Sequence, residues 1–154
     1  MKVSDCLKKK RPGRRVQGLA ACLLPFDDNG AIAGQAFREA VARTAEAGLG
    51  CAVNMDTGYA NYIAPSEKTE VLRWTVDTLG RGQDFAAGAF VEGREGDLED
   101  LYRREMDEIV SYGGTPVIFQ TTRFHDWEPQ RIIDLYASIC EPYPNVIGFE
   151  LGQV

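Results

Sequence analysis

Short apolar runs alternate with amphipathic segments along nearly the whole of this 154-residue chain. The apolar runs are too short for buried helices and are bounded by turn-forming residues, which is typical of buried strands. The segments between them repeat their apolar residues at helical spacing. This strand and helix order predicts an α/β fold with a parallel sheet and right-handed helical crossovers. The expected strands span 16–26, 50–55, 85–91, 115–121 and 145–151.

Capping residues indicate where the four intervening helices begin and end. The first helix is expected over 35–47, with Phe37 and Val41 on its buried side. Ser66 and Asp97 are expected to cap the second and third helices, because their side-chain oxygens can accept hydrogen bonds from first-turn N–H groups. Pro129 belongs in the first turn of the fourth helix. Glycines that can end a helix follow three of them: Gly48, Gly80 and Gly113.

Composition and charge limit the class of protein. With 44% hydrophobic and 26% charged residues, the chain resembles an ordinary globular domain. No apolar stretch approaches the roughly 20 residues that span a bilayer, so a membrane partner is not expected. The four cysteines have no C-x-x-C spacing and no signal-peptide core precedes them, which favours a cytoplasmic protein without disulfides.

The first fifteen residues form a basic segment that differs from the rest of the chain. Residues 1–15 carry seven Lys or Arg and one Asp, a net charge of +6, whereas the remainder carries ten Lys or Arg against 22 Asp or Glu, or −12. A nucleic-acid patch is not expected, because no aromatic residue interleaves with the basic ones. The sequence therefore predicts a solvated tail over 1–15 and one domain over 16–154.

Two motifs stand where the first two strands end. Leu24-Pro25-Phe26-Asp27 closes the first apolar run, and Asn54-Met55-Asp56-Thr57-Gly58 closes the second. The carboxyl ends of parallel strands meet at one face, which is where barrel enzymes place their active sites. These motifs therefore predict the first two βα units of a barrel's active face.

The order of these motifs resembles the dihydrodipicolinate synthase / N-acetylneuraminate lyase family of class I aldolases, which are (β/α)8 TIM barrels. Further matches are Ala47-Gly48-Leu49 before the second strand, Ser66-Glu67-Lys68 in the second helix and Ala87-Gly88 in the third strand. Nearly the whole chain aligns with the first five βα units of such a barrel. The resemblance implies an incomplete barrel, a divergent branch of the family, and lyase or aldolase chemistry on a 2-oxo acid such as pyruvate.

The resemblance also implies roles for particular residues. In the family, a Thr-Thr-Gly-Glu turn after strand two holds the substrate carboxylate, and Thr57 and Gly58 match its second and third residues. Asp56 and Tyr59 replace the first and fourth. The family tyrosine that ends strand five is absent, and Glu150 is the candidate acid/base in its place. Asp56 is the second catalytic candidate, while Thr57, Gly58 and Tyr59 are candidates for binding substrate.

The family's Schiff-base lysine lies on strand six and has no counterpart in this sequence. Lys68, the only lysine outside the basic tail, falls on a helix expected in the outer ring, so this chain alone is expected to be inactive. The lysine chemistry requires no cofactor and no metal ion. A half-barrel would leave the edges of its first and last strands unpaired, which predicts a homo-oligomer or a non-catalytic half-barrel that self-assembles.

The residues alone also allow other chemistry. Oxygen and imidazole ligands at the strand ends could bind a divalent cation for a metal-dependent barrel enzyme; they are Asp56, Glu92, Gln120, His125 and Glu150. Capping of the following turns is the alternative for Glu92, and a packed loop position for His125. Arg123 could clamp a substrate carboxylate or form a surface salt bridge. Tyr59, Asn61 and Tyr62 either line the mouth of a pocket or pack under a loop.

Overall fold

The computed structural model describes residue 13 and residues 17–149. The predicted tail, apart from Gly13, and the candidate Glu150 lie outside the described residues. The strands are β1 (Leu19–Ala21), β2 (Gly50–Val53), β3 (Phe85–Ala89), β4 (Thr115–Phe119) and β5 (Ile147–Phe149). The α-helices are α2 (Gly34–Glu46), α3 (Pro65–Leu79), α4 (Leu98–Ser111) and α5 (Pro129–Cys140), and two 3-10 turns are η1 (Asp56–Gly58) and η2 (Thr122–Phe124).

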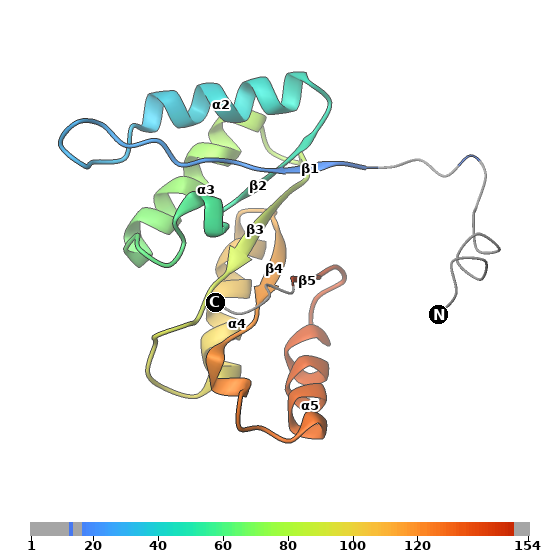
Figure 1. Cartoon of the computed structure of the whole chain (residues 1–154). Helices are drawn as coiled ribbons and strands as arrows, with labels where there is room; N and C mark the ends of the chain where they lie inside the picture. The colour runs from blue at the N-terminus through green and yellow to red at the C-terminus, as the bar shows by residue number, and fades with distance from the viewer. Residues whose placement is uncertain (1–12, 14–16, 150–154) are drawn as a thin grey trace, which may run out of the picture.

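The described strands form one parallel sheet in chain order, β1-β2-β3-β4-β5. Each pairs only with its neighbours in the sequence, as in the pairs Ala52 with Ala86 and Ile118 with Gly148. Figure 1 shows the strands following one another in this order, with a helix after each of the first four. The sheet curls into a half-barrel, which confirms the predicted parallel βα repeats of a partial TIM barrel.

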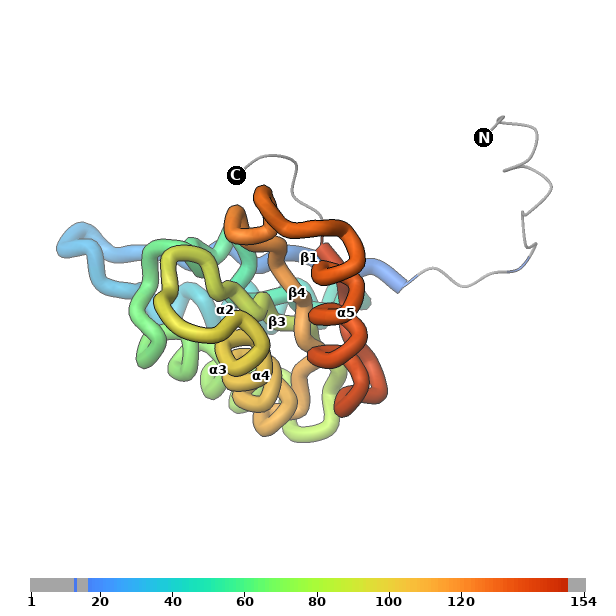
Figure 2. The backbone as a smooth tube through the Cα atoms, turned by 90° about the horizontal axis from the view of Figure 1, so that it is seen from below, coloured from blue at the N-terminus to red at the C-terminus, as the bar shows by residue number. Residues whose placement is uncertain are grey.

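The two faces of the sheet are covered differently. The larger core packs the helices on the outer face, with Phe37, Leu72 and Met106 from three helices against Val53 and Ile118. The smaller core contains only residues from strands and strand ends; they are Ala52, Met55, Ala86, Val117 and Phe119, with Phe90, Ile147 and Phe149 packed against them. The helices therefore surround the convex side (Figure 2), and the inner side is lined by strands alone.

Helix boundaries agree with the sequence, except at one cap. Asp97 caps α4, because its Oδ1 accepts from the N–H groups of Glu99 at 2.9 Å and Asp100 at 3.2 Å. The prediction that Ser66 caps α3 is wrong, since the helix begins at Pro65 after an extended Ala64. Pro65 sets the first helical φ, which makes Ala64, two residues before the serine, the N-cap. In the described part of the chain, none of the helices combines the length and apolarity needed to cross a bilayer.

The first four strands end earlier than their predicted apolar runs. The run predicted as a strand over 50–55 pairs only to Val53, because Asn54 adopts a left-handed conformation with φ 51°. Asn54 is only 4% exposed, and its Nδ2 donates to the Lys68 carbonyl at 3.2 Å. Across the sheet, a Cβ on Gly88 would lie 2.2 Å from the Asn54 carbonyl oxygen. Only a glycine in β3 therefore permits the turn that begins at Asn54.

Lys68 lies on the outer ring, as predicted, but it is buried rather than solvated. Its side chain fits between α3 and α4, with 8% of the residue exposed. The Nζ lies 3.7 Å from a Glu105 carboxylate oxygen and 5.4 Å from the centre of the Phe90 ring. Arg94 donates to the other Glu105 oxygen. Burial lowers the pKa of Lys68 despite the attraction of Glu105.

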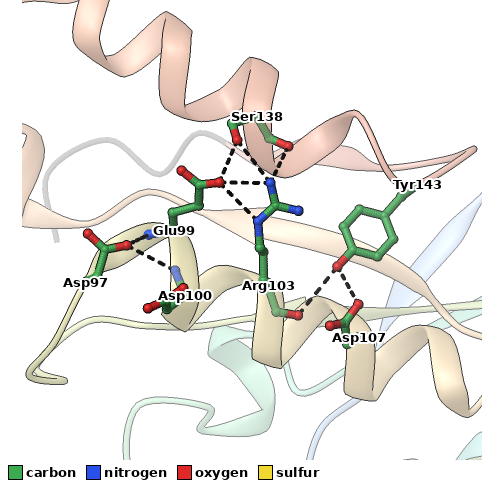
Figure 3. Close-up of polar contacts among 7 residues, drawn as sticks. All are labelled: Asp97, Glu99, Asp100, Arg103, Asp107, Ser138 and Tyr143. Atoms are coloured by element: carbon green, nitrogen blue, oxygen red, sulfur yellow. Dashed lines mark hydrogen bonds and ion pairs between the residues drawn. The ribbon is translucent and has the colours of Figure 1, made fainter.

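A second polar network fastens α5 to α4 (Figure 3). Glu99 Oε1 accepts from Arg103 Nη2 at 2.8 Å and from Ser138 Oγ at 2.6 Å. After α5, the Tyr143 hydroxyl donates to Asp107 Oδ1 at 2.6 Å. Burial, reinforced by this hydrogen bond, raises the pKa of Tyr143 to about 12. These contacts position the last described helix and the segment leading into β5.

The contact at Gly88 generates a stability prediction. We expect Gly88→Ala to lower the free energy of unfolding by about 2 kcal/mol or more, because the new methyl group would overlap backbone and the Phe119 ring. Gly148→Ala in β5 is the matched control, since no atom of the described residues lies within 4 Å of its Cβ position. Urea denaturation followed by circular dichroism measures both variants. Equal stabilities would show that β2 and β3 do not approach as closely as described.

The buried ion cluster generates a second prediction. Glu105→Gln should lower the free energy of unfolding by about 3 kcal/mol, because it leaves a buried ammonium without a counter-charge. Lys68→Met should cost about 1 kcal/mol or less, since Glu105 keeps Arg94 and the methionine stem fills the same space. Thermal and urea denaturation of the two variants measure this asymmetry. A Lys68→Met variant as unstable as Glu105→Gln would contradict it.

Candidate functional site

The carboxyl ends of the strands meet at one rim, where a cavity of about 220 Å³ opens. The residues around it come from η1 and the segment after it and from the ends of β3 and β4; they are Asp56, Tyr59, Asn61, Tyr62, Phe90, Glu92, Phe119 and Gln120. In parallel α/β folds, this end of the sheet is where ligands bind. Three of the predicted strand-end oxygen ligands, Asp56, Glu92 and Gln120, therefore lie around one space.

The turn η1 carries the predicted carboxylate-binding residues. The left-handed Asn54 ends β2, and Asp56, Thr57 and Gly58 then form one 3-10 turn. Asp56 and Thr57 are exposed, and among the described residues neither side chain forms a hydrogen bond. The Gly58 N–H donates to the Met55 carbonyl at 2.9 Å, so it is already used within the turn. The Thr57 hydroxyl is thus the donor of this turn that stands open to a ligand.

Tyr59, just after η1, packs against Phe26 in the segment that follows β1. Its backbone is left-handed, with φ 56°, and its ring meets the Phe26 ring edge-on at a centroid distance of 5.4 Å. The Tyr62 ring lies 6.5 Å from that of Tyr59, and both tyrosines border the cavity. Tyr59, Asn61 and Tyr62 therefore line a pocket, which was one of the two arrangements that the sequence allowed.

Glu92 is held in place by two threonines. Its Oε2 accepts from the Thr121 hydroxyl at 2.5 Å and the Thr122 N–H at 2.8 Å, and Oε1 accepts from the Thr122 hydroxyl. Burial opposes its ionisation, but these hydrogen bonds and nearby Arg123 outweigh that effect and lower the pKa of Glu92. Glu92 therefore caps the turn η2, as the capping alternative predicted, and still borders the cavity as a carboxylate.

Arg123 and His125 do not border the cavity. Arg123 Nη1 donates to the Gly96 carbonyl at 3.0 Å, which joins the loop after β4 to the loop after β3. His125 is exposed at the end of η2. Within residues 17–149, no group of three or more His, Cys, Asp or Glu lies close enough together to hold a metal ion.

Two aromatic residues of the cavity went unnoticed in the sequence. Phe90 and Phe119 stand at the ends of β3 and β4, with ring centroids 5.8 Å apart, and Phe119 lies 5.2 Å from Phe149. Strand alternation could have identified them, because both follow the inward positions Ala86 and Val117 with an even spacing. An aromatic residue at an inward-facing position near the carboxyl end of a strand is therefore a candidate for lining the site.

A larger hollow lies at the opposite end of the strands. Its volume is about 660 Å³, and it is bordered by the ends of α3 and α4 and the 80–83 turn. None of the predicted site residues reaches it. The conserved geometry of parallel sheets favours the smaller cavity at the carboxyl ends as the functional site.

Comparisons with known proteins agree with this geometry at the level of fold. No protein-family model and no curated protein sequence matches the chain. Dihydrodipicolinate synthase from Bacillus clausii matches 90% of this chain and 46% of its own length at 17% identity, with a TM-score of 0.71. A dihydrodipicolinic acid synthase family protein from E. coli K12, solved in complex with pyruvate, matches 88% and 44% at 12% identity and TM-score 0.73.

N-acetylneuraminate lyase from Fusobacterium nucleatum matches 87% of this chain and 45% of its own length at 18% identity, with a TM-score of 0.68. The chain thus spans less than half the length of each of these structures. At such low identity the likeness concerns the course of the backbone. The chain has the fold of the N-terminal half of the dihydrodipicolinate synthase and N-acetylneuraminate lyase barrels.

Proposed function

We propose that this chain forms the substrate-binding side of a lyase or aldolase that acts on a 2-oxo acid through a Schiff base. The observation that carries the proposal is the turn η1, in a fold of the dihydrodipicolinate synthase type. Its first residue, Asp56, borders the rim cavity, and the next residue, Thr57, is exposed although it is not itself part of the cavity lining. One protein of that fold was solved with pyruvate, a 2-oxo acid. Thr57 would donate its hydroxyl hydrogen to the acid's carboxylate.

The proposed reaction also needs an amine for the Schiff base and groups that transfer protons. A Schiff base requires a neutral amine that reaches the substrate carbonyl, and Lys68 is enclosed between two helices and paired with Glu105. We assign the amine to a sixth strand, as the family resemblance implies. Asp56 at the cavity and Glu150 after β5 would then transfer protons to and from the bound acid. Gly58 and Tyr59 shape the turn, and Arg123, whose Nη1 donates to the Gly96 carbonyl outside the cavity lining, would bind the substrate from the loop after β4.

Thr57 provides the direct test of this proposal. Thr57→Val should raise the dissociation constant of pyruvate about tenfold or more, because a hydrogen bond to a charged group contributes about 1.5–3 kcal/mol. Thr57→Ser, which keeps the hydroxyl, should bind within about threefold of the unmodified chain. Isothermal titration calorimetry with pyruvate measures all three proteins. Identical affinities for the valine and serine variants would rule out Thr57 as the carboxylate ligand.

A second role in assembly is favoured by the surface of β1. This strand is at an edge of the described sheet, and it exposes Leu19 by 52%, while Leu23, just after it, is 67% exposed. An unpaired edge with large apolar side chains is a site for pairing with another chain. We propose that two copies of the chain associate through this edge, which would make the protein a homo-oligomer.

The assembly proposal predicts a change of mass. Leu23→Asp should dissociate the oligomer, because the interface would have to bury an unpaired carboxylate. Ile133→Asp is the matched control, since Ile133 is a similarly exposed aliphatic residue on α5. Size-exclusion chromatography with light scattering gives the mass of each protein. A monomer at all concentrations for the unmodified chain, or an intact oligomer for Leu23→Asp, would contradict association through β1.

A further inference from the structure

We propose that the rim cavity binds a cationic amine, so that the substrate is a 2-oxo acid whose far end carries an ammonium group. This inference rests on the proposed function, because it takes the same rim as the substrate site. It specifies the chemistry of the end of the substrate opposite the carboxylate that Thr57 would bind. Its support comes from the charge, the aromatic walls and the size of the cavity.

The charge around the cavity has one sign. Asp56 and Glu92 are the charged residues among the eight that line it. The nearest basic side chains are not part of the lining: Arg123 acts on Glu92 from outside the cavity, and Lys68 is paired with Glu105. A second carboxylate placed here would be repelled, whereas an ammonium group would be attracted by both acids.

Hydrogen bonds hold the negatively charged Glu92 carboxylate in one orientation. The hydroxyls of Thr121 and Thr122 and one backbone N–H hold both of its oxygens, and these donors are all neutral. The carboxylate therefore stays oriented without losing its charge to a bonded cation. A ligand's ammonium group would supply the positive charge that these hydrogen bonds lack.

The remaining walls suit the same ligand. Four aromatic rings border the cavity, from Tyr59, Tyr62, Phe90 and Phe119, and the amides of Asn61 and Gln120 complete it. Aromatic faces attract cations, and rings combined with carboxylates are a common way to recognise alkylammonium groups. A volume of about 220 Å³ is below that of pockets for whole drug-sized ligands. The cavity therefore fits one end of a molecule.

The test uses the full chain and simple probes. Tetramethylammonium chloride is titrated while the ring resonances of the cavity tyrosines and phenylalanines are followed by NMR, with tert-butanol as a neutral probe of similar shape. Sodium chloride keeps the ionic strength constant. The ammonium probe should shift the cavity resonances in a saturable way and bind about tenfold more tightly than tert-butanol.

Two variants locate the effect. Asp56→Asn and Tyr62→Leu should each weaken tetramethylammonium binding about threefold to tenfold, because they remove one charge or one ring. Asp134→Asn is the control, an exposed aspartate on α5 outside the cavity lining, and should change binding less than about twofold. Equal binding of the two probes, absence of saturable shifts, or an unaffected Asp56→Asn variant would overturn the inference.

The outcome is separable from that of the proposed function. Pyruvate titrated alone reports on Thr57, and tetramethylammonium titrated alone reports on the cavity. Tetramethylammonium binding that depends on Asp56, without pyruvate binding that depends on Thr57, would support the cationic site and refute the 2-oxo acid. The reverse result would keep the 2-oxo acid and overturn the cationic site.

Discussion

Parallel pairing between strands that follow one another in the chain is the constraint on which the rest of this structure depends. Parallel neighbours cannot be joined by a tight turn, so each connection must return along the sheet, and here it does so as a helix on the convex side. The same geometry brings the carboxyl ends of β2, β3 and β4 to one rim. The cavity and its polar residues are consequences of that order.

The rim depends on a few backbone positions more than on the helices. Asn54 ends β2 in a left-handed conformation and turns the chain into η1, and this arrangement requires that Gly88 lacks a side chain. The loops after β3 and β4 are joined through Glu92, which accepts hydrogen bonds from Thr121 and Thr122. The side chains around the cavity are thus positioned by contacts between loops of successive βα units.

The sequence predicts the order of elements well, because apolar periodicity directly reflects which face of a strand or helix is buried. Asp97 was identified as a cap because its environment is local. Three features could not be predicted from local patterns. The left-handed Asn54 depends on Gly88 in another strand, the burial of Lys68 depends on Glu105 in another helix, and the contact of Phe90 with Phe119 depends on the register of β3 against β4. Each is a tertiary contact between residues far apart in sequence.

The way in which Glu92 is fixed has a consequence for the rate at which ligands arrive. A carboxylate in an ion pair with arginine or lysine presents little net field to solvent. Glu92 is held by hydroxyls and an amide, with Arg123 nearby, so a larger part of its charge acts outward. The sequence beyond the basic tail is acidic as well, with ten basic against 22 acidic residues over 16–154. Diffusing cations would therefore be steered toward this rim and anions slowed, and added salt would diminish the difference between them.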